Sequence, residues 1–159
     1  MKSITLLTLL TSLSISAFAA DSSITQSYIQ LSEQKKLEQD KTWLRLMYAN
    51  EKGKSEVEYS GYFLSNQGKS DLKKELHSNI QALFQSAEPN QSVRCRFPAR
   101  SQWIMRQLEI QESELPAVEC PEYDQWMGQI KPHKATLIYA TDFMGNPSSM
   151  FGHTLLRLD

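Results

Sequence analysis

The residues best suited to chemistry lie near the end of the sequence, in NPSSMFGHTLLRLD at positions 146–159. His153 follows Gly152, and two hydroxyl residues, Ser148 and Ser149, precede them. A histidine titrates near neutral pH and suits general acid–base catalysis when a strand holds its ring. Gly152 permits close approach of a substrate, and either serine could donate to an oxyanion or serve as a nucleophile beside His153. We therefore predict that His153 is catalytic, with Ser148, Ser149 and Gly152 as the site wall or oxyanion candidates.

The competing interpretation makes His153 an ordinary polar residue of a half-buried strand. Asp142 and Asp159 are near enough in sequence to orient its ring, but the GxSxG nucleophile elbow is absent. The chain has three histidines, none at metal-ligand spacing, and His77 is followed four residues later by Gln81. We expect neither a metal site nor a cofactor, and His77 is best interpreted as a partly exposed helical residue.

The first residues, MKSITLLTLLTSLSISAFAA, have the pattern of a secretory signal peptide. Lys2 precedes an uncharged apolar stretch that is too short to span a bilayer, and Ala17 and Ala19 give an A-x-A cleavage pattern. We predict a signal peptide over residues 1–19 and a mature domain over 20–159. With a net charge of -1 and no basic stripe, nucleic acid is not an expected partner, and any membrane contact would be peripheral.

Cys95 and Cys120 are the two cysteines of the chain. In an exported protein such a pair favours a disulfide, which would stabilise the fold by about 3–4 kcal/mol. The alternative makes Cys95 a nucleophile near a helix start, working with His153. Pro98 is expected to open that helix and to leave Cys95 outside it. Arg94, Arg96 and Arg100 lie close by and could bind an anionic head group, although solvent or a carboxylate is the commoner partner.

Apolar periodicity predicts the elements that must position these residues. Helical signals cover 21–50 and are firmest over 35–49, a helix capped by Ser70 or Asp71 follows, another begins near Pro98, and a short one covers 122–130. The stretch SGYFLS at 60–65 is expected to form a strand or an extended bridge.

From Lys134 the period changes to that of strands. ATLIYATDF predicts a first strand and MFGHTLLRLD a second, with Phe151, His153, Leu155 and Arg157 on one face. Two strands alone make a poor sheet with open edges. The expected fold class is therefore α+β, a helical region followed by the first strands of a sheet that continues beyond residue 159.

Taken together, these residues resemble the Lnb N-terminal periplasmic domain family over roughly residues 40–159. The resemblance rests on WLRLMYANEKGKSEVEYSGYFLSNQGKSDLKKEL, CRFPARSQWIMRQL, ECPEYDQWM and above all ATLIYATDFMGNPSSMFGHTLLRLD. The family looks related to papain-like and NlpC/P60-like thiol enzymes, with the histidine motif before the cysteine motif. The resemblance thus implies a permuted papain-like sheet and a periplasmic location.

The family is named for a lipoprotein N-acyltransferase, which moves an acyl chain to the N-terminal amine of a lipoprotein. The resemblance implies that His153 is the general base, that Cys95 and Cys120 form the disulfide, and that the nucleophilic cysteine follows Asp159. The present chain alone would then be inactive, and its partners would be bacterial lipoproteins and phospholipid acyl donors. The alternative function is a non-catalytic periplasmic binding or assembly module.

Overall fold

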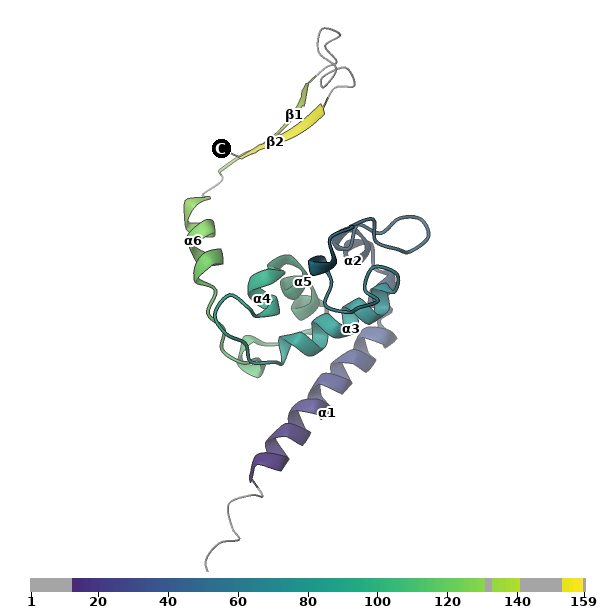
Figure 1. The fold of residues 1–159 in the computed structure, drawn as a ribbon, viewed down its shortest axis with the longest axis vertical. Coiled ribbons are helices and arrows are strands. Elements are labelled where there is room, and N and C mark those ends of the chain that lie inside the picture. The colour runs from purple at the N-terminus through teal and green to yellow at the C-terminus, as the bar shows by residue number, and fades with distance from the viewer. Residues whose placement is uncertain (1–12, 131–132, 141–152, 159) are drawn as a thin grey trace, which may run out of the picture. The chain divides into compact units, whose positions relative to one another are not determined.

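The computed structural model describes residues 13–130, 133–140 and 153–158, and the chain divides into two compact units between Cys120 and Pro121. Unit 1 contains α1 (Leu13–Gln34), η1 (Leu37–Gln39), α2 (Lys41–Leu46), η2 (Ser60–Tyr62), α3 (Leu72–Leu83), α4 (Val93–Arg96), α5 (Pro98–Leu108) and η3 (Glu112–Glu114) (Figure 1). Unit 2 contains α6 (Pro121–Gln129), β1 (Ala135–Ala140) and β2 (His153–Leu158). A mostly helical chain with an antiparallel strand pair confirms the α+β class.

The core of unit 1 forms around two stacked tryptophans. The rings of Trp43 and Trp103 lie 5.7 Å apart, and the Trp43 indole N–H donates to the carbonyl of Leu72 at 3.2 Å. Such pairs combine a large buried apolar area with a satisfied polar group. The apolar residues of α3 and α5, and Phe84 after α3, are buried around this centre: Leu72, Leu76, Ile80, Leu83, Phe84, Trp103, Ile104 and Leu108.

Two helices begin where the sequence predicts. The Asp71 side chain accepts the backbone N–H of Lys74 at 3.0 Å, which caps α3. Pro98 occupies the first turn of α5, where its missing N–H has no cost and its fixed φ suits a helix. Both predicted starts are confirmed.

The predicted helix over 35–49 is wrong as a single element. Lys36 adopts a left-handed φ of 53° after α1, and only the short η1 follows it. Asp40 then caps a new helix, because its side chain accepts the backbone N–H of Thr42 at 2.7 Å. The chain therefore turns and restarts as α2, while α1 runs without a break to Gln34.

The predicted strand or bridge at SGYFLS is also wrong, because Ser60–Tyr62 forms the 3₁₀ turn η2. The Tyr62 hydroxyl donates to the carbonyl of Leu46 at 2.5 Å, and the Arg100 guanidinium lies 3.9 Å from the Tyr62 ring centre. These contacts with distant segments hold the turn, and they override the local preference of an aromatic run for a strand.

Helix α1 joins the core through its second half. Of its residues whose side chains the structure describes, Ile29 is the first to be buried, and Tyr28 stacks on Phe84 at 5.5 Å. Residues 1–12 of the predicted signal peptide lie outside the described residues, so the leader and its cleavage stay predictions. Within the described chain, no helix has both the length and the apolar character needed to cross a bilayer.

Candidate functional site

The candidate catalytic histidine is the first residue of a paired strand. β1 and β2 run antiparallel, with Ala140 opposite His153 at one end and Ala135 opposite Leu158 at the other. Residues two apart along a strand share a face, so positions 153, 155 and 157 lie on one face as predicted. Pairing with β1 fixes the backbone position of His153, and a general base needs such a fixed position.

The other predicted members of the site cannot be placed around His153. Ser148, Ser149 and Gly152 lie outside the described residues, and so do Asp142 and Asp159. Their roles as oxyanion donor, site wall or orienting carboxylate therefore stay predictions. The hairpin is the part of the predicted site that the structure describes.

One face of the hairpin is apolar and open to solvent. Leu137 pairs with Leu156, and these side chains are 72% and 66% exposed. Tyr139 and Leu158 lie on the same face and are exposed as well. Leucine and tyrosine at such exposure form the kind of contiguous apolar surface that usually receives further protein.

Unit 2 as described has no interior of its own. None of its described residues is buried, and Trp126 and Met127 on α6 are exposed like the hairpin leucines. A two-stranded sheet without a packed face is at best marginally stable in water. A closed catalytic pocket around His153 therefore needs polypeptide in addition to the described part of this unit.

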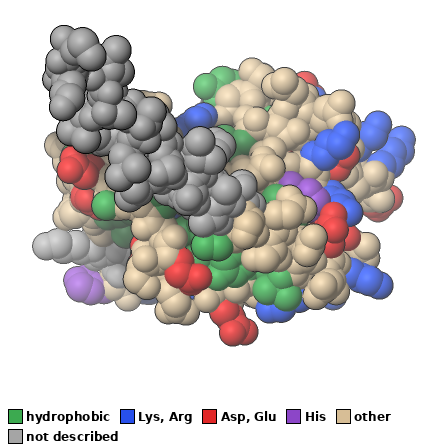
Figure 2. Space-filling view, turned by 90° about the horizontal axis from the view of Figure 1, so that it is seen from below, with side chains coloured by type: hydrophobic (Ala, Val, Ile, Leu, Met, Phe, Trp, Pro, Cys, Tyr) green, Lys and Arg blue, Asp and Glu red, His purple; other side chains and the backbone are tan. Residues whose placement is uncertain are grey.

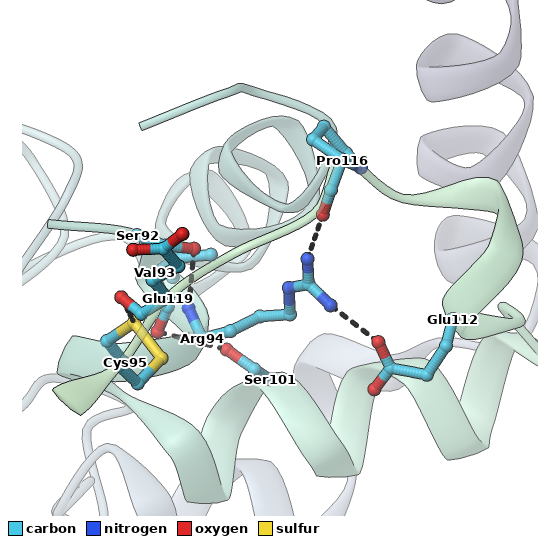
Figure 3. Close-up of a disulfide and its surroundings, with 9 residues drawn as sticks. Ser92, Val93, Arg94, Cys95, Ser101, Glu112, Pro116 and Glu119 are labelled. Carbon is cyan, nitrogen blue, oxygen red and sulfur yellow. Dashed lines mark hydrogen bonds and ion pairs between the residues drawn. A yellow bond between two sulfur atoms is a disulfide. The ribbon is translucent and has the colours of Figure 1, made fainter. Parts of the chain in front are cut away.

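The two cysteines are joined as Cys95–Cys120, and no free cysteine is present (Figure 3). This contradicts the alternative in which a free Cys95 works with His153. Cys95 lies outside α5, as predicted, but it is part of the short helix α4, whose N-cap is Ser92, and not of a loop. We call residues 109–120 the strap. The disulfide joins the end of the strap to α4.

Arg94 fixes the same strap by polar contacts. Its guanidinium donates to the Glu112 carboxylate at 2.5 Å and to the carbonyl of Pro116 (Figure 3). The backbone N–H of Asn90 donates to the carbonyl of Glu119 at 2.9 Å. The strap is therefore held to α4 by a covalent bond, an ion pair and a side-chain hydrogen bond, and to Asn90 before α4 by a backbone hydrogen bond.

A buried ion pair between α3 and α5 was missed by the sequence analysis. Glu75 is 0% exposed and Arg100 3% exposed, with Nη1 of Arg100 3.4 Å from Oε1 of Glu75. The carboxylate also accepts the backbone N–H groups of Leu64 at 3.0 Å and Ser65 at 2.9 Å. The amide of Asn79 donates to it at 2.8 Å. Several donors thus compensate the cost of burying the charge.

The sequence did contain a signal for this pair. Glu75 and Asn79 stand three and seven residues after Leu72, inside the apolar stripe of α3, where an unpaired charge would be costly. The Arg100 side chain also lies between two aromatic rings, 3.9 Å from the centre of Tyr62 and 4.3 Å from that of Phe97. Arg100 and Arg94 therefore have carboxylate partners, the commoner of the two fates expected for the arginines.

His77 is a partly exposed residue of α3, as predicted. Its Nε2 lies 3.6 Å from the Glu33 carboxylate of α1, which also pairs with Lys73 at 2.8 Å. Burial lowers the pKa of His77, and the nearby Glu33 opposes that shift. Among the described residues, no group of three or more histidine, cysteine or acidic side chains could hold a metal ion.

Two family models match separate stretches of the chain. Residues 35–107, within unit 1, match a domain of unknown function (DUF7843). The second match covers α6 and the hairpin. Residues 122–159 match the Lnb N-terminal periplasmic domain. The Lnb match confirms the resemblance for the stretch that contains His153, and it indicates a periplasmic protein. No curated protein and no solved structure matches the chain.

Proposed function

We propose that residues 122–159 supply the general base, His153, of a periplasmic thiol acyltransferase or hydrolase with a permuted papain-like sheet. The observation that carries this proposal is the Lnb N-terminal periplasmic domain match over that stretch. The position of His153 at the start of a paired strand supports it, because the backbone there is held by the β1–β2 register.

The nucleophile in this proposal is a cysteine in sequence that follows Asp159. Cys95 and Cys120 are both consumed by the disulfide, so neither can provide a thiolate. The unburied hairpin and α6 support the same arrangement, because further polypeptide is needed to cover them. The domain over residues 20–159 is then one that additional sequence completes.

In the first step, His153 takes the thiol proton and the thiolate attacks the carbonyl carbon of an acyl ester. The tetrahedral intermediate collapses, the ester C–O bond breaks, and the imidazolium returns the proton to the leaving alkoxide. The products are a thioester and an alcohol. Ser148, Ser149 and the backbone at Gly152 are the proposed donors and wall beside the developing oxyanion.

In the second step, a neutral amine attacks the thioester carbonyl, and His153 accepts a proton from the attacking nitrogen. Collapse of the intermediate breaks the C–S bond and gives an amide, and the proton on His153 returns to the thiolate. Water in place of the amine gives a carboxylic acid. The proposed donor is a phospholipid and the proposed acceptor is the N-terminal amine of a bacterial lipoprotein.

The test uses the gene product extended past Asp159, with a p-nitrophenyl acyl ester as the probe. We expect thiol-dependent release of p-nitrophenol that iodoacetamide abolishes, while the 159-residue chain releases none. His153→Ala in the extended protein should lower the rate at least about a hundredfold, since general-base catalysis contributes on that order. Far-ultraviolet circular dichroism should show an unchanged fold.

His133→Ala is the matched control, because His133 is an exposed histidine just before β1. Its rate should equal that of the unsubstituted protein. Turnover by the 159-residue chain alone would contradict the proposal, as would full activity of the His153→Ala variant. Unfolding of the His153→Ala variant would instead support the interpretation of His153 as a structural strand residue.

The exposed apolar face of the hairpin favours a second candidate, a non-catalytic periplasmic binding or assembly module. In that function a partner protein covers Leu137, Tyr139 and Leu156, and His153 has no chemical role. Retention of partner binding by the His153→Ala variant, with no turnover by any version of the protein, would favour this candidate over the enzyme.

A further inference from the structure

The outward face of α2 in unit 1 is cationic. Trp43 and Met47 are both fully buried on its inner side. Lys41, Arg45 and Tyr48 follow one another at intervals of four and three residues, and all three are exposed. This spacing puts them on one face of the helix and its C-terminal turn. Neither cation has a side-chain hydrogen bond or ion pair in the described part of the chain.

The turn after α2 adds two more lysines on a fixed frame. The Asn50 side chain accepts the backbone N–H groups of Lys52 at 3.0 Å and Lys54 at 3.2 Å, and Gly53 supplies a φ of 69° between them. The buried Ser55 hydroxyl ties the end of the turn to the carbonyl of Met47 at 2.6 Å. The turn stands out from the helices beside α2 (Figure 1).

In these segments cations outnumber acids, while the whole chain has a net charge of -1. Residues 40–56 contain four cationic side chains and three carboxylates: Asp40, which caps α2, Glu51, and Glu56, whose backbone N–H donates to the carbonyl of Tyr48 at 3.0 Å. On the face shown in the space-filling view, basic and acidic side chains are interspersed (Figure 2). We call Lys41, Arg45, Tyr48, Lys52 and Lys54 the α2 patch.

Tyr48 occupies a backbone position that favours glycine. Its φ is 49°, its N–H donates to the carbonyl of Arg45 at 3.1 Å, and the N–H of Ala49 donates to the carbonyl of Leu44 at 2.9 Å. These are the two bonds of a Schellman motif, in which the left-handed residue is usually glycine. A bulky tyrosine there is strained, yet its side chain is 64% exposed. The ring makes one edge contact with Tyr62.

We propose that the α2 patch docks unit 1 on an anionic phospholipid surface. Lysines are hydrated point charges that need no shaped partner, and each contributes to attraction near an anionic membrane. Tyrosine is favoured at membrane–water interfaces, where its ring meets lipid and its hydroxyl meets water. The periplasmic family match places such surfaces within reach. This docking proposal is independent of the proposed catalytic activity, because vesicle binding can be measured in a protein that has no turnover.

The test measures partitioning of the full chain onto phosphatidylcholine vesicles with and without phosphatidylglycerol. Any contribution from exposed apolar residues acts on both vesicles, so the difference isolates the charged surface. We expect a preference for the anionic vesicles that falls as salt is added. Lys52→Ser with Lys54→Ser should weaken that preference by at least about tenfold. Tyr48→Gly should weaken binding as well, while its thermal midpoint does not fall.

Arg106→Gln with Lys134→Gln is the matched control, because it removes two exposed cations that lie outside the α2 patch. Its anionic preference should stay within about twofold of the unsubstituted chain. An equal loss in this control would overturn the proposal, because net charge alone would then account for binding. Equal partitioning of the unsubstituted chain on both vesicles would also overturn it, even if the patch bound an acidic protein.

Discussion

Glu75 and Lys69 illustrate how differently single charges act in this protein. The Lys69–Glu58 pair is short, at 2.5 Å, but both side chains are exposed to solvent. Glu75 is fully buried, and Arg100 and backbone N–H groups compensate its charge. Removal of one partner from a buried pair leaves an uncompensated charge, whereas water replaces a lost surface partner.

We therefore predict that Glu75→Ala lowers the free energy of unfolding by about 3–5 kcal/mol, because Arg100 stays buried without its carboxylate. Urea denaturation followed by tryptophan fluorescence measures this, since Trp43 and Trp103 report on the same core. Glu58→Ala is the control and should leave the midpoint nearly unchanged. Similar midpoints for the two variants would show that Glu75 is not a structural charge.

Single residues also mark the limit of prediction from sequence. The strand that carries His153 follows from alternating apolar residues, but no local pattern gives its partner in β1 or the groups that meet its ring. Glu75 could have been recognised, because a charge inside an apolar stripe needs a buried partner. That this partner is Arg100 depends on how α3 and α5 pack, which no short stretch of sequence encodes.

Among the elements, those with a local capping signal were predicted well. Asp71 and Pro98 mark the starts of α3 and α5, and each acts through its own side chain or ring. The errors at 35–49 and 60–65 lie where such a signal is absent or is overridden. Lys36 adopts its left-handed backbone without a glycine, and Tyr62 is held by Arg100 and Leu46 from other segments. At Tyr62, contacts between elements outweigh the local propensity for a strand.

The strap is the element that depends most on covalent support. Cys95→Ala with Cys120→Ala should lower the free energy of unfolding by about 3–4 kcal/mol, because the reduced chain regains the entropy of an open loop with a separation of 25 residues. Urea denaturation of the unsubstituted protein in dithiothreitol should give the same loss. The double variant should be insensitive to dithiothreitol, and any further destabilisation of it would point to another cause.

At the scale of the whole molecule, the two units differ in what stabilises them. Every buried apolar side chain in the described residues belongs to unit 1, from Ile29 to Leu115. Unit 2 relies on the hydrogen bonds of a helix and a hairpin. Local opening costs little where few apolar contacts are lost. The function proposed for His153 is therefore expected to depend on the polypeptide that covers unit 2.

We predict that backbone amides of β1 and β2 in the 159-residue chain exchange with deuterium at least about a hundredfold faster than those of α3 and α5. Mass spectrometry of peptic fragments measures the rates. In the protein extended past Asp159, the hairpin amides should become protected while those of α3 stay as they were. Strong protection of the hairpin in the shorter chain would show that unit 2 is complete without additional sequence.

The position of the disulfide has a mechanical consequence. Cys120 is the last residue of unit 1, so tension applied to the chain at Pro121 passes through the sulfur bridge directly into α4. α5 and the strap lie inside the bridged loop and bear none of that load. Pulling on the C-terminal unit would therefore extend only the chain outside the bridge. When unit 1 unfolds under this force, the gain in contour length would exclude the residues between Cys95 and Cys120 until a reductant breaks the disulfide.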